Sequence, residues 1–255
     1  MTLVEVVAVL LAGFAAGTIN TVVGSGTLIT FPTLLAFGVP PVSANVSNAI
    51  GLVPGSVSGA IGYRRELAGQ RERIRRLTLG TFLGACLGAA LLLVLPPGVF
   101  ETAVPVLIAL GVVLVLGQPR ISRWVARRHA HLGGLPEHGA RWVWPAIFLV
   151  GVYCGYFGAA QGVLMMAVLG IGVDDSLQRL NGVKNVLAAL GNFVAGVIFV
   201  AAAFDRVDWS MVALIAAGAI VGGQVGARYG RRLPPAALRA VIVVVGVVAL
   251  VAFLV

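Results

Sequence analysis

Charged residues are scarce in this sequence. They make up 11% of its 255 residues, whereas hydrophobic residues make up 59%, and soluble domains have about 25% charged residues. This imbalance excludes an ordinary soluble domain and predicts an integral membrane protein. A membrane-spanning helix needs about 20 mainly apolar residues. Segments of about this length are 42–62, 77–95, 98–117, 142–160, 180–204, 210–227 and 236–255.

Cysteine and buried acid are also rare. Only Cys86 and Cys154 occur, which excludes a disulfide framework, and for Cys154 a packing role is favoured over thiol chemistry on a sulfur substrate. None of the nine acidic residues falls in the middle of an apolar segment, so we expect neither a carboxylate proton relay nor a carboxylate-lined cation site. No cofactor and no metal are expected, although His129, His131 and His138 in the central loop leave a metal site as the weaker alternative.

The net charge of +9 lies at the ends of apolar segments, which indicates membrane orientation rather than nucleic-acid binding. Three basic groups lie at 64–76, 120–141 and 228–232, whereas the opposite ends carry acids such as Glu101 and Asp205. Because Lys and Arg mark the cytoplasmic side, we expect the central loop inside and both termini outside the cell membrane. The expected partners are the lipid bilayer and a small anionic substrate, and the sequence leaves a homodimer open.

The sequence repeats itself. An offset of 138 places Gly13, Gly17, Gly80, Gly84, Gly88, Pro96 and Pro97 on Gly151, Gly155, Gly218, Gly222, Gly226, Pro234 and Pro235. An offset of 136 places Gly26, Asn45 and Gly55 on Gly162, Asn181 and Gly191. The basic stretch 71–76 precedes the glycine run in the first half, whereas 228–232 follows it in the second, so the matched segments should cross in opposite directions.

These observations predict an all-α integral membrane bundle with an inverted-topology repeat, which is typical of secondary transporters. The predicted organisation is a first membrane repeat at 1–117, a cytoplasmic linker at 118–141 and a second, inverted membrane repeat at 142–255.

Each half opens with an apolar segment that a glycine-rich turn interrupts. The turns lie at 23–27 and 159–162, and the pieces after them, 28–38 and 163–172, are short. Twelve residues of helix reach only about 18 Å, less than the roughly 30 Å hydrocarbon core. A break at that depth must face protein or water, so we expect the two breaks to share a cavity. Each broken pair is either a re-entrant hairpin or two short crossings.

Residues at the breaks and on the next segment of each half are the candidate substrate-binding residues. A helix N-terminus offers free N–H groups and a positive dipole end, which together bind an anion. The candidates are Asn20, Gly24, Ser25, Gly26, Thr27, Asn45, Ser47, Asn48, Gln161, Gly162, Asn181, Lys184 and Asn185. Lys184 is the sole lysine of the chain; it either neutralises an anionic substrate or snorkels toward the interface.

Two further features have structural interpretations. Gly80, Gly84, Gly88 and their partners in the second half are expected to let helices pack closely. Arg179 is expected to be an interfacial anchor with a local ion pair to the adjacent acids at 174 and 175.

The first-half pattern resembles the opening of TauE/SafE proteins, the sulfite-exporter-like permeases. It consists of Gly13-x3-Gly17-x2-Asn20-x3-Gly24-Ser25-Gly26-x5-Pro32-x-Leu34, followed by Gly38, Pro41, Ala44, Ser47 and Asn48. The second half, from Gly151-x3-Gly155 through Gly162 to Asn181 and Asn185, is similar to the weaker repeat of that family. The resemblance covers essentially the whole chain, although Ser25 stands where the family often has glycine and the cluster at Gly162 is thin.

The resemblance implies a bacterial or archaeal inner-membrane carrier for sulfite or small sulfonates. We expect a multi-pass exporter, because an anion leaving a negative cytoplasm gains about 2.3 kcal/mol per charge per 100 mV. The alternatives are a passive anion channel or an uptake permease for another small anion. A membrane enzyme or assembly factor is least favoured, because the apolar segments contain no paired acids and no nucleophile with a base.

Overall fold

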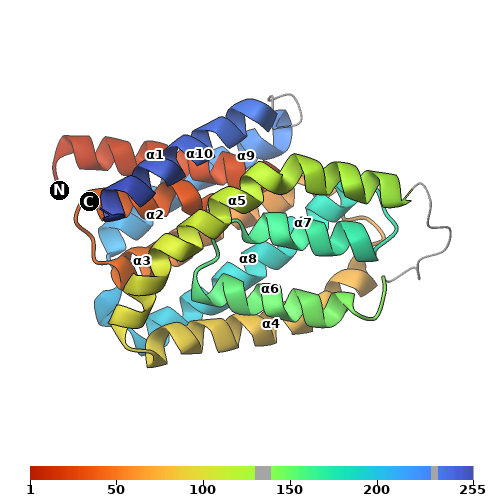
Figure 1. The fold of residues 1–255 in the computed structure, drawn as a ribbon, viewed down its shortest axis with the longest axis horizontal. Coiled ribbons are helices and arrows are strands. Elements are labelled where there is room, and N and C mark those ends of the chain that lie inside the picture. Colours follow the sequence, from red (N-terminus) through yellow and green to blue (C-terminus); the bar gives the residue numbers. More distant parts are fainter. Residues whose placement is uncertain (130–138, 231–234, 255) are drawn as a thin grey trace.

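The computed structural model describes residues 1–129, 139–230 and 235–254, and over these ranges it is helical without any strand. The helices are α1 (Leu3–Val22), α2 (Thr27–Ala36), α3 (Pro41–Gly62), α4 (Arg71–Val94), α5 (Pro97–His129), α6 (Val143–Tyr156), α7 (Gln161–Gly172), α8 (Leu177–Ala202), the 3-10 helix η1 (Phe204–Arg206), α9 (Trp209–Tyr229) and α10 (Pro235–Leu254). They lie roughly along the long axis of the molecule, with both termini at the same end (Figure 1).

Five helices in the described ranges are long and apolar enough to cross a membrane: α1, α4, α5 as far as Ile121, α8 and α9. The predicted all-α membrane bundle is thereby confirmed. The apolar helices α2, α6 and α7 are shorter. The expected span 142–160 is wrong as a single helix, because α6 has 14 residues and ends at Tyr156, where the second break begins.

Helix α5 is longer than expected. It continues to His129 with Pro105 and Pro119 inside it, so the segment expected to be a linker from 118 onward begins as helix. His131 and His138 lie outside the described residues.

The helices pack as two groups of three, each of which draws on both halves of the chain. In one group α9 packs against α1 and α3, and in the other α4 packs against α6 and α8. The two groups meet where α3 packs against α8. Outside both groups, α5 packs against α10. Exchanging the halves of the chain therefore maps each group onto the other.

Glycines make the contacts within these groups close, because small residues let helix backbones approach. A Cβ built at Gly84 would lie 2.2 Å from the carbonyl oxygen of Phe148 on α6, and one at Gly222 would lie 2.0 Å from that of Phe14 on α1. The predicted packing role of these glycine runs is confirmed.

The same contacts give the directions of the helices. Gly13 of α1 faces Ile215 of α9, and Gly17 faces Ala219, so α1 and α9 run in parallel. Figure 1 shows α1 and α6, which open the two halves, running in opposite directions. These directions agree with the predicted inverted repeat, whose placement across a membrane stays a prediction.

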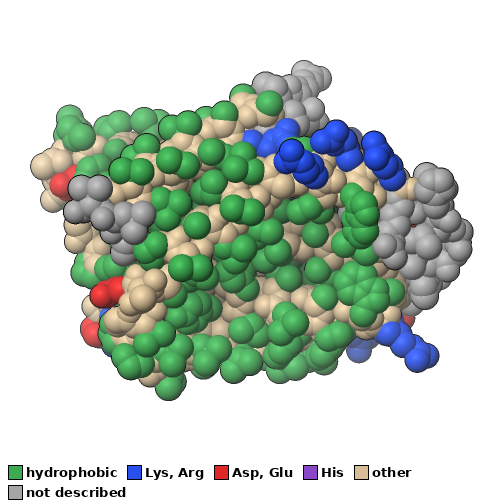
Figure 2. Space-filling view, in the orientation of Figure 1, with side chains coloured by type: hydrophobic (Ala, Val, Ile, Leu, Met, Phe, Trp, Pro, Cys, Tyr) green, Lys and Arg blue, Asp and Glu red, His purple; other side chains and the backbone are tan. Residues whose placement is uncertain are grey.

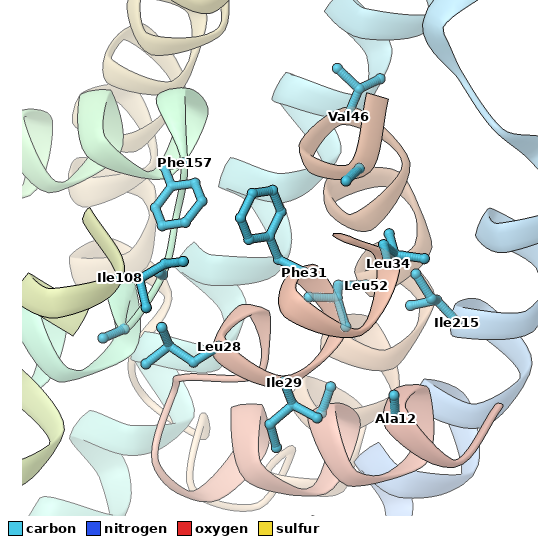
Figure 3. Close-up of a cluster of buried hydrophobic side chains, with 14 of the residues drawn as sticks. Ala12, Leu28, Ile29, Phe31, Leu34, Val46, Leu52, Ile108, Phe157 and Ile215 are labelled. Atoms are coloured by element: carbon cyan, nitrogen blue, oxygen red, sulfur yellow. The ribbon is translucent and has the colours of Figure 1, made fainter. Parts of the chain in front are cut away.

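The short helix α2 begins inside the protein, where its first turns are buried, and it ends at the exposed Ala36. Its residues Leu28, Phe31 and Leu34 are almost fully buried, and they point toward side chains of α3, α5 and α9 (Figure 3). The Phe31 ring meets that of Phe157 edge to face, with 5.1 Å between centroids. This packing explains how a helix of 10 residues is tolerated in a membrane protein.

Charge separates toward the two ends of the bundle. On the face shown in Figure 2, Lys and Arg gather toward one end and acidic side chains toward the other. Arg64 and Arg65, which follow α3, line one pocket together with Arg228 at the end of α9. The basic groups after α3 and at the end of α9 therefore share one end of the molecule.

Candidate functional site

The two helix breaks meet at the centre of the molecule. The backbone N–H of Gly162 donates to the carbonyl oxygen of Gly24 at 3.0 Å. A Cβ built on Gly24 would lie 2.4 Å from the Cα of Gly162. Gly24 has φ of +87° and Ala160, its match at an offset of 136, has φ of +56°. The same left-handed conformation thus turns the chain at both breaks.

Two short helices begin beside this contact. The residue that precedes each first turn, Gly26 for α2 and Ala160 for α7, provides no side-chain hydrogen bond to the turn. Backbone carbonyl oxygens accept there instead, since the N–H of Leu28 donates to Ser25 at 3.2 Å and that of Val163 donates to Ala160 at 3.0 Å. Ser25 and Gln161 are matched residues of the repeat at the offset of 136. Ser25 Oγ and Gln161 Oε1 are buried, and neither has a hydrogen-bond partner within the described ranges.

A line of side-chain hydrogen bonds crosses the centre and joins four helices. Asn20 of α1 donates through Nδ2 to Ser56 Oγ of α3 at 3.1 Å, and Asn192 of α8 donates to the same oxygen at 3.5 Å. Gln161 of α7 donates to Asn192 Oδ1 at 3.3 Å. The sequence analysis did not select Ser56 or Asn192 for the site, although the 136 offset that pairs Asn45 with Asn181 also pairs these two.

The last turn of α1 is capped by three side chains from α8. Asn181 and Asn185 each donate through Nδ2 to the carbonyl oxygen of Thr21 at 3.2 Å. Lys184 Nζ donates to the carbonyl oxygens of Asn20 at 3.1 Å and Thr21 at 3.2 Å. Lys184 is 0% exposed, so the snorkelling alternative is wrong.

The end of α6 is held in a similar way by the first half. Asn45 donates through Nδ2 to the carbonyl oxygen of Tyr156 at 3.0 Å. Within the second half, Tyr153 of α6 also donates to the carbonyl oxygen of Ala159 at 2.5 Å. Asn45 and Asn181, which are matched in the repeat, thus each bind the opening hairpin of the other half. The Oδ1 atoms of both are buried and lack a partner among the described residues.

Three candidates have local roles at or away from this centre. Asn48 accepts from Thr30 and donates to Thr27 Oγ1 at 3.3 Å, so it fastens α3 to the start of α2. Ser47 is not brought to the centre, because its Oγ accepts the backbone N–H of Asp208 at 2.9 Å, beside the start of α9. The sequence pattern could not show that Ser47 and the adjacent Asn48 have different roles.

Acidic charge lies at the basic end of the bundle. Asp175, in the loop between α7 and α8, accepts from Arg73 Nη1 at 2.6 Å and from Gln70 Nε2 at 3.0 Å. Arg179 Nε lies 2.9 Å from Asp175 Oδ1, which confirms the expected local ion pair. The contact of Asp175 with Arg73 was not expected, because it joins the loop between α7 and α8 to a residue more than 100 positions away.

The charges around Asp175 decide its protonation. Burial favours the neutral acid, but hydrogen bonds from Arg73, the Ser176 backbone and Arg179 outweigh burial and lower the pKa of Asp175.

Within the described ranges, no three His, Cys, Asp or Glu side chains are grouped so that they could hold a metal ion.

Comparison with known proteins identifies the family. The model of the sulfite exporter TauE/SafE family matches residues 9–253. The chain belongs to the TauE/SafE family. No solved structure matches it.

Relatives of this TauE/SafE chain carry the name of transporters. It is 28% identical over 250 residues to the probable membrane transporter protein ORF9 of a Sinorhizobium species, covering 92% of this chain and 87% of the relative. It is 26% identical over 235 residues to the probable membrane transporter protein YfcA of Escherichia coli K12, covering 91% and 83%. A probable membrane transporter protein of Haemophilus influenzae is 26% identical over 218 residues, covering 85% and 81%.

The expected resemblance is therefore confirmed. The TauE/SafE chain is a multi-pass membrane transporter, and family and relatives indicate transport rather than enzymatic activity.

Proposed function

We propose that this transporter exports small sulfur-containing anions, sulfite or sulfonates, from the cytoplasm across the cell membrane. The observation that carries the proposal is the meeting of two broken helices at a buried centre, with the starts of α2 and α7 side by side. Each start presents the positive end of a helix dipole, which suits an oxyanion. Ser25, with its buried and unpaired hydroxyl, adds a donor there.

The family name supports the choice of substrate, since the matching model is that of a sulfite exporter. The absence of acidic residues from the centre, within the described ranges, also favours an anion. Membrane potential supports the direction, because a cytoplasm that is negative expels an anion. In this proposal the two halves form an inverted repeat and rock against each other around the centre, which opens to each side in turn.

The hydrogen bonds of Asn45 and Asn181 provide the test. Each holds the opening hairpin of the opposite half, so replacing both should disturb the site from both sides. We expect Asn45→Ala combined with Asn181→Ala to reduce uptake of radiolabelled sulfite or sulfonate into proteoliposomes about tenfold or more, because two buried hydrogen bonds are lost.

Thr33→Ala is the matched control, since among the described residues the Thr33 hydroxyl bonds only to the carbonyl oxygen of Ile29 within α2, at 2.8 Å. It should transport like the wild type. Unchanged transport by the double variant would refute the site, and no flux of either anion in the wild type under any gradient would refute the function.

A further inference from the structure

The ammonium of Lys184 lies where helix α1 ends. Its two acceptors, the carbonyl oxygens of Asn20 and Thr21, belong to the last turn of α1, whose carbonyls have no partner within the helix. This turn also carries the negative end of the helix dipole. In transporters built from broken helices, such helix ends coordinate the coupling cation. The lysine thus fills a position that suits Na⁺.

The side chain of Lys184 reaches this position across the break of its own half. A Cβ built at Gly162 would lie 3.1 Å from Lys184 Cδ, so the aliphatic stem packs against the start of α7 while the ammonium binds the end of α1. The charge therefore sits between the negative end of one broken pair and the positive end of the other.

No acidic side chain contacts this ammonium in the part of the chain that the structure describes. The acids on the neighbouring elements are Glu5 of α1, Glu66 beside Gly182, Glu72 of α4, Asp205 of η1, and Asp174 and Asp175 before α8. The other charged or titratable groups there are Arg71, Arg73, Arg75, Arg76 and Cys86 of α4, Tyr153, Cys154 and Tyr156 of α6, Arg206 of η1 and Arg179 of α8. Asp175 is bound by Arg73 and Arg179. A buried cation without an acid is costly, and a bound anion would remove that cost.

An ammonium has three N–H donors, and two of them bind α1. The third remains for an oxyanion. The repeat also shows that the charge is not required by the fold as such, because Asn48 occupies the matching position in the first half and is neutral. One half of the carrier therefore holds a cation that the other half lacks.

We propose that Lys184 is the resident cation of this carrier, occupying the position of a free coupling cation, so that the anion is transported without co-transported Na⁺ or H⁺. The inference rests on the proposed function. The loaded centre then combines one fixed positive charge with one monoanion, and the cycle carries net negative charge across the membrane. The anion gradient and the membrane potential drive it.

The first experiment uses the wild-type protein in proteoliposomes with a labelled simple alkanesulfonate, a monoanion that carries no proton near neutral pH. Replacing Na⁺ by K⁺ or choline should leave the rate unchanged. A pH-sensitive dye inside the vesicles should report no proton flux that accompanies the anion, and a potential that is negative on the substrate side should accelerate the flux. A requirement for Na⁺, or a proton moved with each anion, would overturn the proposal.

The second experiment removes the tethered cation. Lys184→Ala frees the carbonyl oxygens of Asn20 and Thr21 for a small free cation. Transport should fall about tenfold or more, because the site loses the charge that neutralises the anion, and added Na⁺ or Li⁺ should restore part of it. Arg75→Gln, which removes an exposed positive charge from α4, should retain wild-type transport without cation dependence.

The experiments distinguish a failure of the proposed function from a failure of the proposed role of Lys184. Lack of any anion flux in the wild type would refute the proposed function, whereas cation-dependent wild-type flux would refute only the role of Lys184. A Lys184→Ala protein that transports at the wild-type rate without added cation would also overturn that role. If this variant does not fold, the wild-type measurements still decide.

Discussion

Gly24 and Gly162 are the residues at which a single methyl group should matter most. Their backbones touch at the centre, and Gly24 adopts a φ of +87°, which L side chains rarely adopt because Cβ crowds the carbonyl oxygen. Gly98, by contrast, has open space where a Cβ would be placed. It is the matched control.

We expect Gly24→Ala to lower the free energy of unfolding by at least about 1–2 kcal/mol, which corresponds to roughly 2–8 °C in the unfolding midpoint. Gly98→Ala should unfold at the wild-type temperature. Thermal unfolding of detergent-purified proteins measures both. Equal midpoints for the two variants would contradict the close contact of the breaks.

The sequence predicted many of the central residues because their types are unusual in a membrane. Asn20 and Gln161 were selected at the breaks, and Asn45, Asn181 and Lys184 on the next segment of each half. The structure brings Asn181 and Lys184 to the end of α1 beside Asn20 and brings Asn45 to the end of α6. Their partners were harder to predict, because Lys184 binds backbone carbonyls, which every residue has, rather than a distinctive side chain. Ser56 was missed since a serine among small residues also suits helix packing.

At the scale of elements, the breaks and the short helices were predicted because glycine clusters and segment length carry that information. Helix ends that depend on distant contacts were not. The sequence analysis ended this apolar segment at Gly117 and began the cytoplasmic linker at 118, but α5 continues to His129 with Pro119 inside. Helix α6 ends early because residues 157–160 turn the chain into α7, where Gly162 meets Gly24.

The loop between α7 and α8 is tied to the start of α4 by the ion pair of Asp175 with Arg73. The pKa of Asp175 in the folded protein lies below its ordinary value of 3.8. Its ionised form therefore stabilises the fold at pH values above the unfolded pKa, and this contribution is lost as the pH falls through the folded pKa.

We expect Asp175→Asn to unfold at a lower temperature than the wild type at neutral pH, and the difference to shrink as the pH is lowered below about 4. Asp174→Asn is the matched control, because Asp174 is the adjacent, exposed acid; it should match the wild type at neutral pH. A difference for Asp175→Asn that is independent of pH would show that charge on Asp175 does not stabilise the loop.

At the scale of the whole molecule, the arrangement of charge predicts the orientation. Both termini lie at one end of the bundle (Figure 1), whereas Arg64, Arg65 and Arg228 share a pocket at an end of α3 and α9. The positive-inside rule places this pocket in the cytoplasm. The termini then lie outside.

In a background with Cys86→Ala and Cys154→Ala, we expect Thr2→Cys to react with a membrane-impermeant maleimide added to intact cells. Ala68→Cys, an exposed position in the loop before α4, should react only after the cells are opened. Reaction of both from outside would contradict the proposed topology, and the opposite pattern would reverse the orientation.

Alternating access makes a further prediction for the whole bundle, since a closed centre must open to each side in turn. Ser25 is 1% exposed and lies at the meeting of the breaks, so Ser25→Cys in the same cysteine-free background should react slowly with an impermeant thiol reagent. During transport the reaction should occur from either side, and excess substrate should protect the thiol.

Thr81→Cys is the matched control, because Thr81 is equally buried and its hydroxyl is also unpaired in the described ranges, but it lies where α4 packs against α6. It should remain unreactive. Reaction of Ser25→Cys from both sides at once, without protection by substrate, would indicate an open channel instead of a carrier.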